Sequence, residues 1–502
     1  MAGTVARTAA RAVTDALNLA GLIAGHARNR PAHPAIVWRD REDEATDYRE
    51  AWRRIEACAA RLAAAGVSTG DRVALALGDH PLHLLLHYAV ARLGAVILPV
   101  DHRWTAAEQQ DVARAFDARC LLADGSDTDY GELTVLRPDD SWYEEPGETP
   151  PPMPEDGDLP VLISLSSGTT GRPKGALVSH RQFYERFVNQ WVTLGINVND
   201  RFVALTPLYF GAGRSFGMCL LAAGGTVVLD PPPHKPEELA EAINRSRATV
   251  AFLVPTLIRR LLPIADGDGH LLPGLKLLIS SGAMLHAEEA REISARLSPR
   301  LLSYYASSEG GGISVLQPHE VAEYADTVGR PVFRVDVEIL GRDGKPVPEG
   351  ETGRLRYRGP GVATRFLDED GHEHGAESGG WFYPGDLAAR GPEGHLMLRG
   401  REKDVIIRGG VNIYPGEIEK ALLSHPDIDE AAVVGRPSAK LGEEPVAFLT
   451  GGLRDPESVL AHCAERLAPY KVPAAVIFLN EMPKSSLGKI LKKDLAQHLN
   501  PG

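Results

Sequence analysis

The sequence predicts an α/β protein with a large N-terminal domain of layered α/β subdomains, a small β-barrel-like subdomain and a small α+β C-terminal domain. The chain of 502 residues is too long for a single hydrophobic core. Up to about residue 325, short apolar runs alternate with amphipathic segments, which is typical of layered α/β structure. Beyond that point, turn sequences such as RDGK and PEGE separate the runs and indicate antiparallel strands.

The strand-like runs of the first part are short and rich in apolar residues. In chain order they are DRVALAL (71–77), AVILPV (95–100), VLISLS (161–166), FVALTPL (202–208), GTVVLD (225–230), ATVAFLVP (248–255) and LKLLISS (275–281). The most apolar long stretch, 82–100, contains His83, His87 and Arg92 and is too polar to cross a bilayer. It predicts a core helix that ends near Leu93 and is followed by a strand.

The second part carries two further sets of elements. The expected antiparallel strands are VDVEIL (335–340), GRLRYRG (353–359) and HLMLRG (395–400). The last hundred residues have their own helix-like and strand-like runs, EIEKALLSH, EAAVVG, EPVAFLT, ESVLAHCAERL and AVIFL. A domain boundary is therefore expected near Gly400, where a charged, loop-like run begins.

Composition and charge exclude several classes of function. A formal net charge of −13 argues against a nucleic-acid-binding protein, because phosphates need positive charge along a groove. The four cysteines, at 58, 120, 219 and 463, have neither a disulfide nor a zinc spacing. Asp15 interrupts the N-terminal segment, so no signal peptide is predicted and we expect a cytoplasmic protein.

The stretch SLSSGTTGRPKG (164–175) combines hydroxyl residues, glycines and two cations. Glycines leave backbone amides free to face an anion, and Lys174 adds a positive charge, so the stretch suits phosphate binding. It is not a Walker A loop, because Pro173 stands five residues after Gly168. Ser179 and Gln182 have the spacing of a capping box, so the expected order is strand, loop and helix. A polar surface turn remains the alternative for the loop alone.

Residues 166–175 match, at every position, the signature [ST]-[ST]-G-T-[ST]-G-x-P-K-G of the adenylate-forming superfamily, which the chain therefore resembles. This superfamily includes acyl- and aryl-CoA ligases, peptide-synthetase adenylation domains and firefly-type luciferases. The resemblance spans essentially the whole chain, because further family landmarks follow in the right order. It implies a triphosphate clamp formed by Ser166, Ser167, Gly168, Thr169, Thr170, Gly171 and Lys174.

The second landmark is a Tyr-Gly-x-Thr-Glu loop, present here as YASSE (305–309) with Ala306 and Ser308 at the Gly and Thr positions. By resemblance Tyr305 packs on the adenine, Ser308 contacts the α-phosphate and Glu309 holds Mg²⁺. The neighbouring Ala306 and Ser307 belong to the same nucleotide loop. In SSGAML, the family pattern places three more residues along the adenine: Ser281, Gly282 and Ala283.

The remaining landmarks lie in the last quarter of the chain. Asp386 in GWFYPGDL matches the family's ribose-binding Asp, and Arg401 matches its nucleotide-contacting Arg. Lys403 matches the hinge, so the resemblance implies residues 1–399 as the large domain, 400–403 as the hinge and 404–502 as a mobile small domain. Lys489 matches the catalytic Lys, although Leu487 stands where Ser or Thr is common. In thioester-forming members, the loop at Gly409 and Gly410 approaches the CoA pantetheine tunnel.

The acyl pocket is expected near Tyr209, Phe210 and the glycines Gly310, Gly311 and Gly312. Three missing side chains suggest room for a ring or an alkyl chain. Arg214 could bind a second carboxylate, but a surface position is the expectation for an Arg beside a turn. The predicted substrate is therefore an apolar aromatic, alicyclic, or medium- to long-chain aliphatic monocarboxylic acid.

The predicted function is that of an acid–CoA ligase that uses ATP, Mg²⁺ and coenzyme A. It would form an acyl-AMP with release of pyrophosphate, and then an acyl-CoA. Alternatives are an adenylation enzyme that loads an acyl carrier protein, a luciferase-like oxygenase, and a nucleotide-binding regulator without catalysis. The retained Glu309, Asp386 and Lys489 argue against the last of these.

Overall fold

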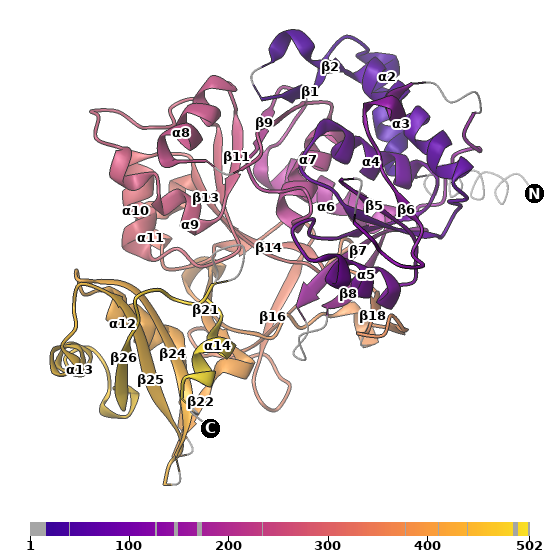
Figure 1. Ribbon diagram of the computed structural model, residues 1–502. Coiled ribbons are helices and arrows are strands. Elements are labelled where there is room, and N and C mark those ends of the chain that lie inside the picture. The colour runs from indigo at the N-terminus through magenta and orange to yellow at the C-terminus, as the bar shows by residue number, and fades with distance from the viewer. Residues whose placement is uncertain are drawn as a thin grey trace, which may run out of the picture.

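The structure is a computed structural model that describes residues 17–39, 41–125, 128–144, 149–167, 173–232, 234–376, 378–409, 411–438, 440–484 and 490–499. The strands of these residues form four sheets. Figure 1 shows three of them in a large upper body, whereas the fourth belongs to the small C-terminal body drawn in yellow. This arrangement agrees with the predicted α/β fold.

The first large sheet has nine strands, and those at its centre run parallel. Their order is β15 (Arg330–Pro331), β14 (Gly311–Leu316), β13 (Leu301–Ser307), β12 (Leu277–Ser280), β11 (Val250–Leu253), β9 (Arg201–Ala204), β10 (Thr226–Leu229), β1 (Pro34–Trp38) and β2 (Thr46–Asp47). Parallel neighbours end at the same edge of a sheet, so the segments that follow β12 and β13 lie together.

The second large sheet has eight strands and is parallel in one half and antiparallel in the other. Their order is β19 (Glu373–Gly375), β18 (Arg365–Leu367), β8 (Pro173–Ser179), β7 (Pro160–Ser167), β4 (Val96–Pro99), β3 (Arg72–Ala76), β5 (Ala118–Ala123) and β6 (Val135–Leu136). The expected order of strand, loop and helix is wrong in one respect. The segment before the helix is itself strand β8, so the glycine-rich stretch lies on a β7–β8 hairpin.

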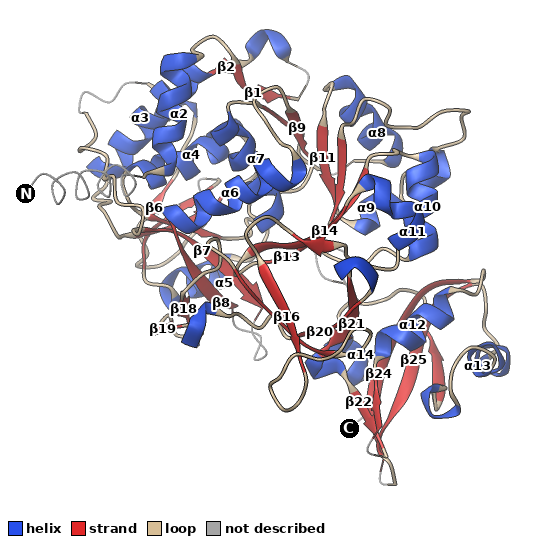
Figure 2. Ribbon diagram, turned by 180° about the vertical axis from the view of Figure 1, so that it is seen from behind, coloured by secondary structure: helices blue, strands red, loops and turns tan. Residues whose placement is uncertain are grey.

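Helices fill the space between the two large sheets and cover their outer faces (Figure 2). Those of the large body are α2 (Leu19–Asn29), α3 (Tyr48–Ala64), α4 (Pro81–Arg92), α5 (Ala106–Ala115), α6 (His180–Leu194), α7 (Gly211–Ala223), α8 (Pro236–Arg245), α9 (Pro255–Arg259), α10 (Ala287–Arg296) and α11 (Val321–Tyr324). The predicted core helix is α4, and every residue of it is buried. The predicted capping box at Ser179 and Gln182 starts α6, with both reciprocal hydrogen bonds formed.

Two smaller sheets complete the chain. The three predicted antiparallel strands and one that was not predicted, β20, form a four-stranded sheet. Its order is β16 (Asp336–Leu340), β17 (Gly353–Arg358), β20 (Asp386–Arg390) and β21 (Leu396–Arg401). The C-terminal sheet consists of β23 (Val411–Ile413), β22 (Ile406–Arg408), β25 (Gly442–Gly451), β24 (Ile428–Ser438) and β26 (Ala475–Phe478). Its helices are α12 (Pro415–Leu423), α13 (Pro456–Ala464) and α14 (Lys492–Gln497).

The two bodies meet at the end of β21 (Figure 1). A single 3₁₀ turn, Glu402–Asp404, separates β21 from the first strand of the C-terminal sheet. A side-chain hydrogen bond of 3.1 Å joins Arg342 of the large body to Asn412 of the small one. Among the described helices, none is long and apolar enough to cross a membrane.

Candidate active site

One edge of the nine-stranded sheet collects the residues predicted to bind a nucleotide. Ser281, Gly282 and Ala283 follow the end of β12, and β13 runs parallel to it up to Ser307. Gly282 adopts a positive φ of 94°, a conformation that favours glycine and turns the chain away from the strand. The two predicted segments are therefore neighbours in space although they are distant in sequence.

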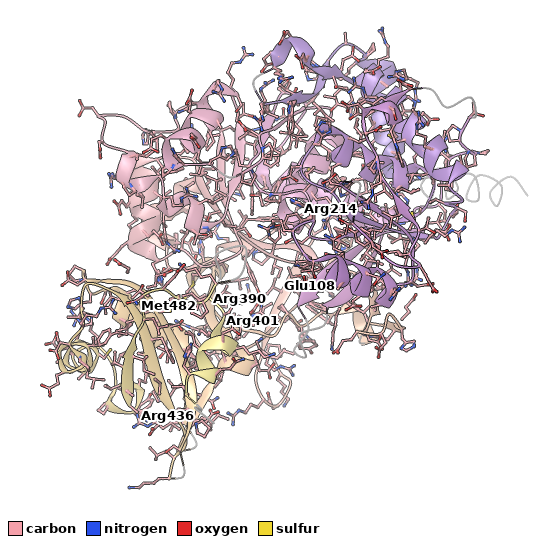
Figure 3. The ribbon with its side chains drawn as sticks, in the orientation of Figure 1. Glu108, Arg214, Arg390, Arg401, Arg436 and Met482 are labelled. Carbon is pink, nitrogen blue, oxygen red and sulfur yellow. The ribbon has the colours of Figure 1, made fainter. Side chains whose placement is uncertain are left out.

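Asp386 is the point at which three predicted residues meet. The Tyr305 hydroxyl donates to Asp386 Oδ2 at 2.5 Å, and Arg401 Nε lies 2.8 Å from Asp386 Oδ1. Asp386 and Arg401 are cross-strand partners on β20 and β21, which fixes their proximity. Burial, and then the neighbouring carboxylate, raise the pKa of Tyr305 well above its usual value, so its hydroxyl remains a donor. Figure 3 shows Arg401 at the border with the C-terminal body.

The residues after Tyr305 form a tight turn, and their side chains differ in burial and in hydrogen bonding. The Ser307 hydroxyl lies 2.5 Å from the Tyr357 hydroxyl and accepts from the Gly310 amide, so it supports the turn itself. Ser308 is exposed, and Glu309 is half-buried. The carboxylate of Glu309 has no hydrogen bond or ion pair with any residue that the structure describes, so it is available to a ligand.

Arg186 holds this turn in place, although it was not among the residues predicted from the sequence. Its buried guanidinium donates to three backbone carbonyl oxygens, those of Gly361 at 2.9 Å, Ser308 at 3.2 Å and Glu309 at 2.6 Å. Burial lowers the pKa of Arg186 to about 10, so the guanidinium remains charged at neutral pH. Arg186 lies on the apolar face of α6 with Phe183. A cation at that position of the helical pattern is the signal that could have identified it.

The environment of Glu309 fits Mg²⁺. Within the described residues no group of three acidic, histidine or cysteine side chains gathers that could enclose a metal alone. Mg²⁺ binds through one or two carboxylates together with phosphate oxygens and waters. Glu309 satisfies that requirement: its carboxylate is half-buried, has no partner among the described residues and lies next to the edge predicted to bind a nucleotide.

The stretch predicted to bind phosphate is only partly within the described residues. Gly168, Thr169, Thr170 and Gly171 lie outside them, and so do the side chains of Ser166 and Ser167. Lys174 is described: it starts the antiparallel return of the hairpin, and its Nζ lies 3.5 Å from Glu369 Oε1. With both partners partly exposed, this ion pair is weak and leaves Lys174 able to exchange partners.

Of the residues predicted at the hinge and in the C-terminal domain, Lys403 and Gly409 are described. Lys403 is exposed in the turn between β21 and β22, and Gly409 has a positive φ of 58° at the end of β22. Gly410 and Lys489 lie outside the described residues. The residue after Lys489, Ile490, forms an antiparallel bridge with Lys484.

The predicted acyl-pocket residues lie at two places. The rings of Tyr209 and Phe210 lie just before α7 with their centroids 4.3 Å apart and their planes tilted by 38°, and the Tyr209 hydroxyl accepts a short hydrogen bond from Arg103. The expectation that the glycines leave open space is wrong at two positions. An added Cβ at Gly310 would come within 2.4 Å of the Tyr357 hydroxyl, and at Gly312 within 2.1 Å of the Tyr304 hydroxyl. The missing side chains therefore accommodate these tyrosines.

The surface position expected for Arg214 is also wrong. Arg214 is 3% exposed and lies on α7, among α4, α6 and α7 in the interior (Figure 3). Its Nη1 donates to the carbonyl oxygens of Leu208 and Tyr209, in the segment that leads into α7. The preference of arginine for the surface was the only basis of the prediction, and this tertiary contact overrides it.

Comparison with protein families gives two matches. A family model described as "AMP-binding enzyme" matches residues 23–367, and a second, described as "AMP-binding enzyme C-terminal domain", matches residues 417–489. Together they contain most of the predicted landmarks. They confirm the resemblance inferred from the sequence.

Individual proteins are similar over nearly the whole chain. A feruloyl-CoA synthase of Amycolatopsis sp is 32% identical over 463 residues, which cover 90% of this chain and 93% of that protein. An indoleacetate–CoA ligase of Aromatoleum aromaticum is 31% identical over 504 residues, covering 96% and 98%. The solved o-succinylbenzoate CoA synthetase of Bacillus subtilis, in complex with its acyl-adenylate intermediate, has a TM-score of 0.83 at 27% identity, covering 94% of this chain and 97% of that one. The predicted fold is thereby confirmed.

Replacement of Arg186 by methionine tests its role as the clamp of the turn. Arg186→Met leaves three carbonyl oxygens without their donor, so the free energy of unfolding should fall by about 2–4 kcal/mol in urea titration. Arg181→Met on the same helix is the control, because Arg181 makes a partly exposed pair with Asp158 and should cost less than about 1 kcal/mol. Equal stability of the two variants would contradict the role of Arg186.

Proposed function

Because this chain belongs to the AMP-binding enzyme family, we propose that it is an ATP-dependent acid–CoA ligase that works in two steps. The first step joins a carboxylic acid to AMP and releases pyrophosphate. The second transfers the acyl group to the thiol of coenzyme A and releases AMP. The relatives' names support the acid–thiol ligase class, and the contact of Tyr305 and Arg401 with Asp386 is the structural observation that carries the proposal.

The Asp386 carboxylate has the capacity to bind a ribose. An ionised carboxylate offers about four acceptor positions, and Tyr305 and Arg401 use two of them. The remaining positions suit the two hydroxyl groups of a ribose, which are hydrogen-bond donors. Tyr305 is then placed to stack on the base, next to the segment that begins at Ser281.

The remaining predicted site residues must stabilise the negative charge that accumulates in the first step. A carboxylate and the α-phosphate of ATP are both negative, so the site must supply positive charge where the new bond forms. We assign this task to Lys489, with Lys174 and the triphosphate stretch orienting the pyrophosphate that leaves. Mg²⁺ held by Glu309 would neutralise phosphate charge when bound. Ser308, which is exposed beside it, is placed to donate to the α-phosphate.

The two steps need different groups at one site, and a hinge provides them in turn. We assign residues 1–399 to the large domain, 400–403 to the hinge and 404–502 to the small domain. Lys403 stands in the 3₁₀ turn between the last strand of one domain and the first of the next. Rotation there would withdraw Lys489 and present the loop at Gly409 and Gly410, where the pantetheine thiol would enter.

We propose that the body of the acid is apolar, and aromatic or alicyclic acids are favoured over medium- and long-chain aliphatic ones. The adjacent, mutually tilted rings of Tyr209 and Phe210 before α7 offer an aromatic wall, which suits a ring. Both of the curated relatives described above carry an aromatic acid in their names.

Product formation tests the proposed function directly. With ATP, MgCl₂, CoA and a panel of ring acids, mass spectrometry should detect AMP and acyl-CoA in equal amounts, and neither without an acid. Glu309→Gln should lower the rate by about a hundredfold or more, because it removes negative charge from the proposed Mg²⁺ ligand. Glu349→Gln, at an exposed turn position, is the matched control. Failure to form acyl-CoA from any acid, or thioester formation only with an acyl carrier protein as the acceptor, would refute the assignment to CoA.

A pair of variants separates the two steps. Lys489→Ala should reduce acyl-AMP formation by about a hundredfold or more, yet spare thioester formation from supplied acyl-AMP. Lys403→Pro should have the opposite effect, because proline restricts the backbone rotation of the proposed hinge. Lys493→Ala, an exposed lysine of α14, controls for loss of charge. Equal loss of both steps in both variants would contradict the assignment of Lys489 to the first step and of the Lys403 hinge to the second.

A further inference from the structure

Arg214 is a buried cation whose hydrogen-bonding capacity is largely unused. Its Nη1 donates to Leu208 O at 3.3 Å and to Tyr209 O at 3.0 Å. Its Nε is buried and has no hydrogen-bond partner. A guanidinium has five N–H donors, so the two backbone contacts account for only part of its capacity.

No anion balances the charge of Arg214 among the described residues. The ionisable groups that face it are Arg186 of α6, and His83 and His87 of α4. Burial, and then the charge of Arg186, lower the pKa of Arg214 to about 9, so it stays protonated at neutral pH. Burial lowers the pKa of His83 to about 3 and that of His87 well below 6.5, so neither histidine adds charge.

The two histidines do not compensate Arg214. Nδ1 of His83 lies 3.2 Å from Gly78 O and Nδ1 of His87 lies 2.8 Å from His83 O, so both carry their proton on Nδ1. Their Nε2 atoms are buried without a partner. A buried charge without a counter-ion is costly, and proteins retain one where a ligand supplies the partner.

The position of Arg214 indicates that its ligand is the acid substrate. It contacts the carbonyl of Tyr209, which belongs to the proposed aromatic wall, and it lies close enough to Arg186 for their charges to interact. Arg186 in turn holds the turn that carries Glu309. Arg214 therefore lies between the two places where acyl-pocket residues were predicted, and Figure 3 shows it inside the large body, away from the C-terminal body.

We propose that Arg214 binds an acceptor oxygen at the end of the acid remote from the reacting carboxylate, and that a second carboxylate is its best partner. A guanidinium binds carboxylates through parallel N–H donors, which favours a charged partner over a neutral one. This inference rests on the proposed ligase function and refines it: the acid has an apolar body and an oxygen-bearing end. It also favours a dicarboxylic acid as the substrate, an alternative that the sequence alone disfavoured.

Binding of three matched acids tests the subsite without requiring turnover. The acids are 3-phenylpropanoates that carry a methyl, acetyl or carboxylate group at the para position, titrated by calorimetry in the presence of AMP. The wild-type protein should bind the para-carboxylate at least about tenfold more tightly than the para-methyl acid, with the para-acetyl acid between them. Arg214→Met should lower the ratio of the affinity for the para-carboxylate to that for the para-methyl acid to one or below. Arg214→Lys should keep a preference for the para-carboxylate, because it retains the charge.

Matched controls make the outcomes decisive. Arg114→Met on α5, an exposed position, should keep the wild-type ratio. A wild-type ratio near one, or a ratio that neither Arg214 variant changes, would overturn the subsite. If Arg214→Met does not fold, Arg214→Gln takes its place: it removes the charge but keeps a polar side chain, and it should bring the affinity ratio close to one. Preferential binding of the para-carboxylate without thioester formation from any acid would refute the ligase function and leave the subsite intact, so the two failures can be told apart.

Discussion

The buried guanidinium of Arg186 is the contact on which the candidate site depends. It binds carbonyl oxygens from the turn after β13 and from the segment after β17, and so ties helix α6 to two parts of the chain that are far away in sequence. Because the backbone of Glu309 is held in this way, its carboxylate is left free. The close approach also explains two glycines: an added Cβ at Gly361 would lie 2.9 Å from Arg186 Cγ, and at Gly311 3.1 Å.

Two buried arginines of the large domain, Arg186 and Arg214, differ in how their charges are compensated. Three carbonyl oxygens from distant segments surround the guanidinium of Arg186, which suits a structural role. Arg214 contacts only the two carbonyls of the adjoining segment and leaves its Nε without a partner. A neighbouring cation and two neutral histidines make the surroundings of Arg214 favourable for an incoming anion. This difference in hydrogen bonding is consistent with a structural role for Arg186 and with the ligand-binding role proposed for Arg214.

Local patterns in the sequence predicted most of the fold, whereas most of the candidate site residues came from the resemblance to the family. The apolar run of α4, the capping box at Ser179 and the antiparallel strands after residue 325 all follow from short-range chemistry. The meeting of Tyr305, Asp386 and Arg401 could be expected only through the family pattern, because the residues are separated by up to 96 positions in the chain.

The failures share a physical cause, since each depended on contacts between different structural elements. Residues 173–179 became a strand because β7 and β18 pair with them on both sides. The glycines after Glu309 make way for tyrosines from β13 and β17, and Arg214 is buried by packing among helices. A local sequence pattern does not show which strands, turns and helices will come into contact.

The central claim is that this chain activates a carboxylic acid through an adenylate. Exchange of labelled pyrophosphate into ATP, measured without CoA, tests it most directly, because it reports the reversible first step alone. The account predicts exchange that requires a ring acid and is lost in Asp386→Ala. Exchange that proceeds without any acid, or that is absent with every acid of the panel, would contradict it.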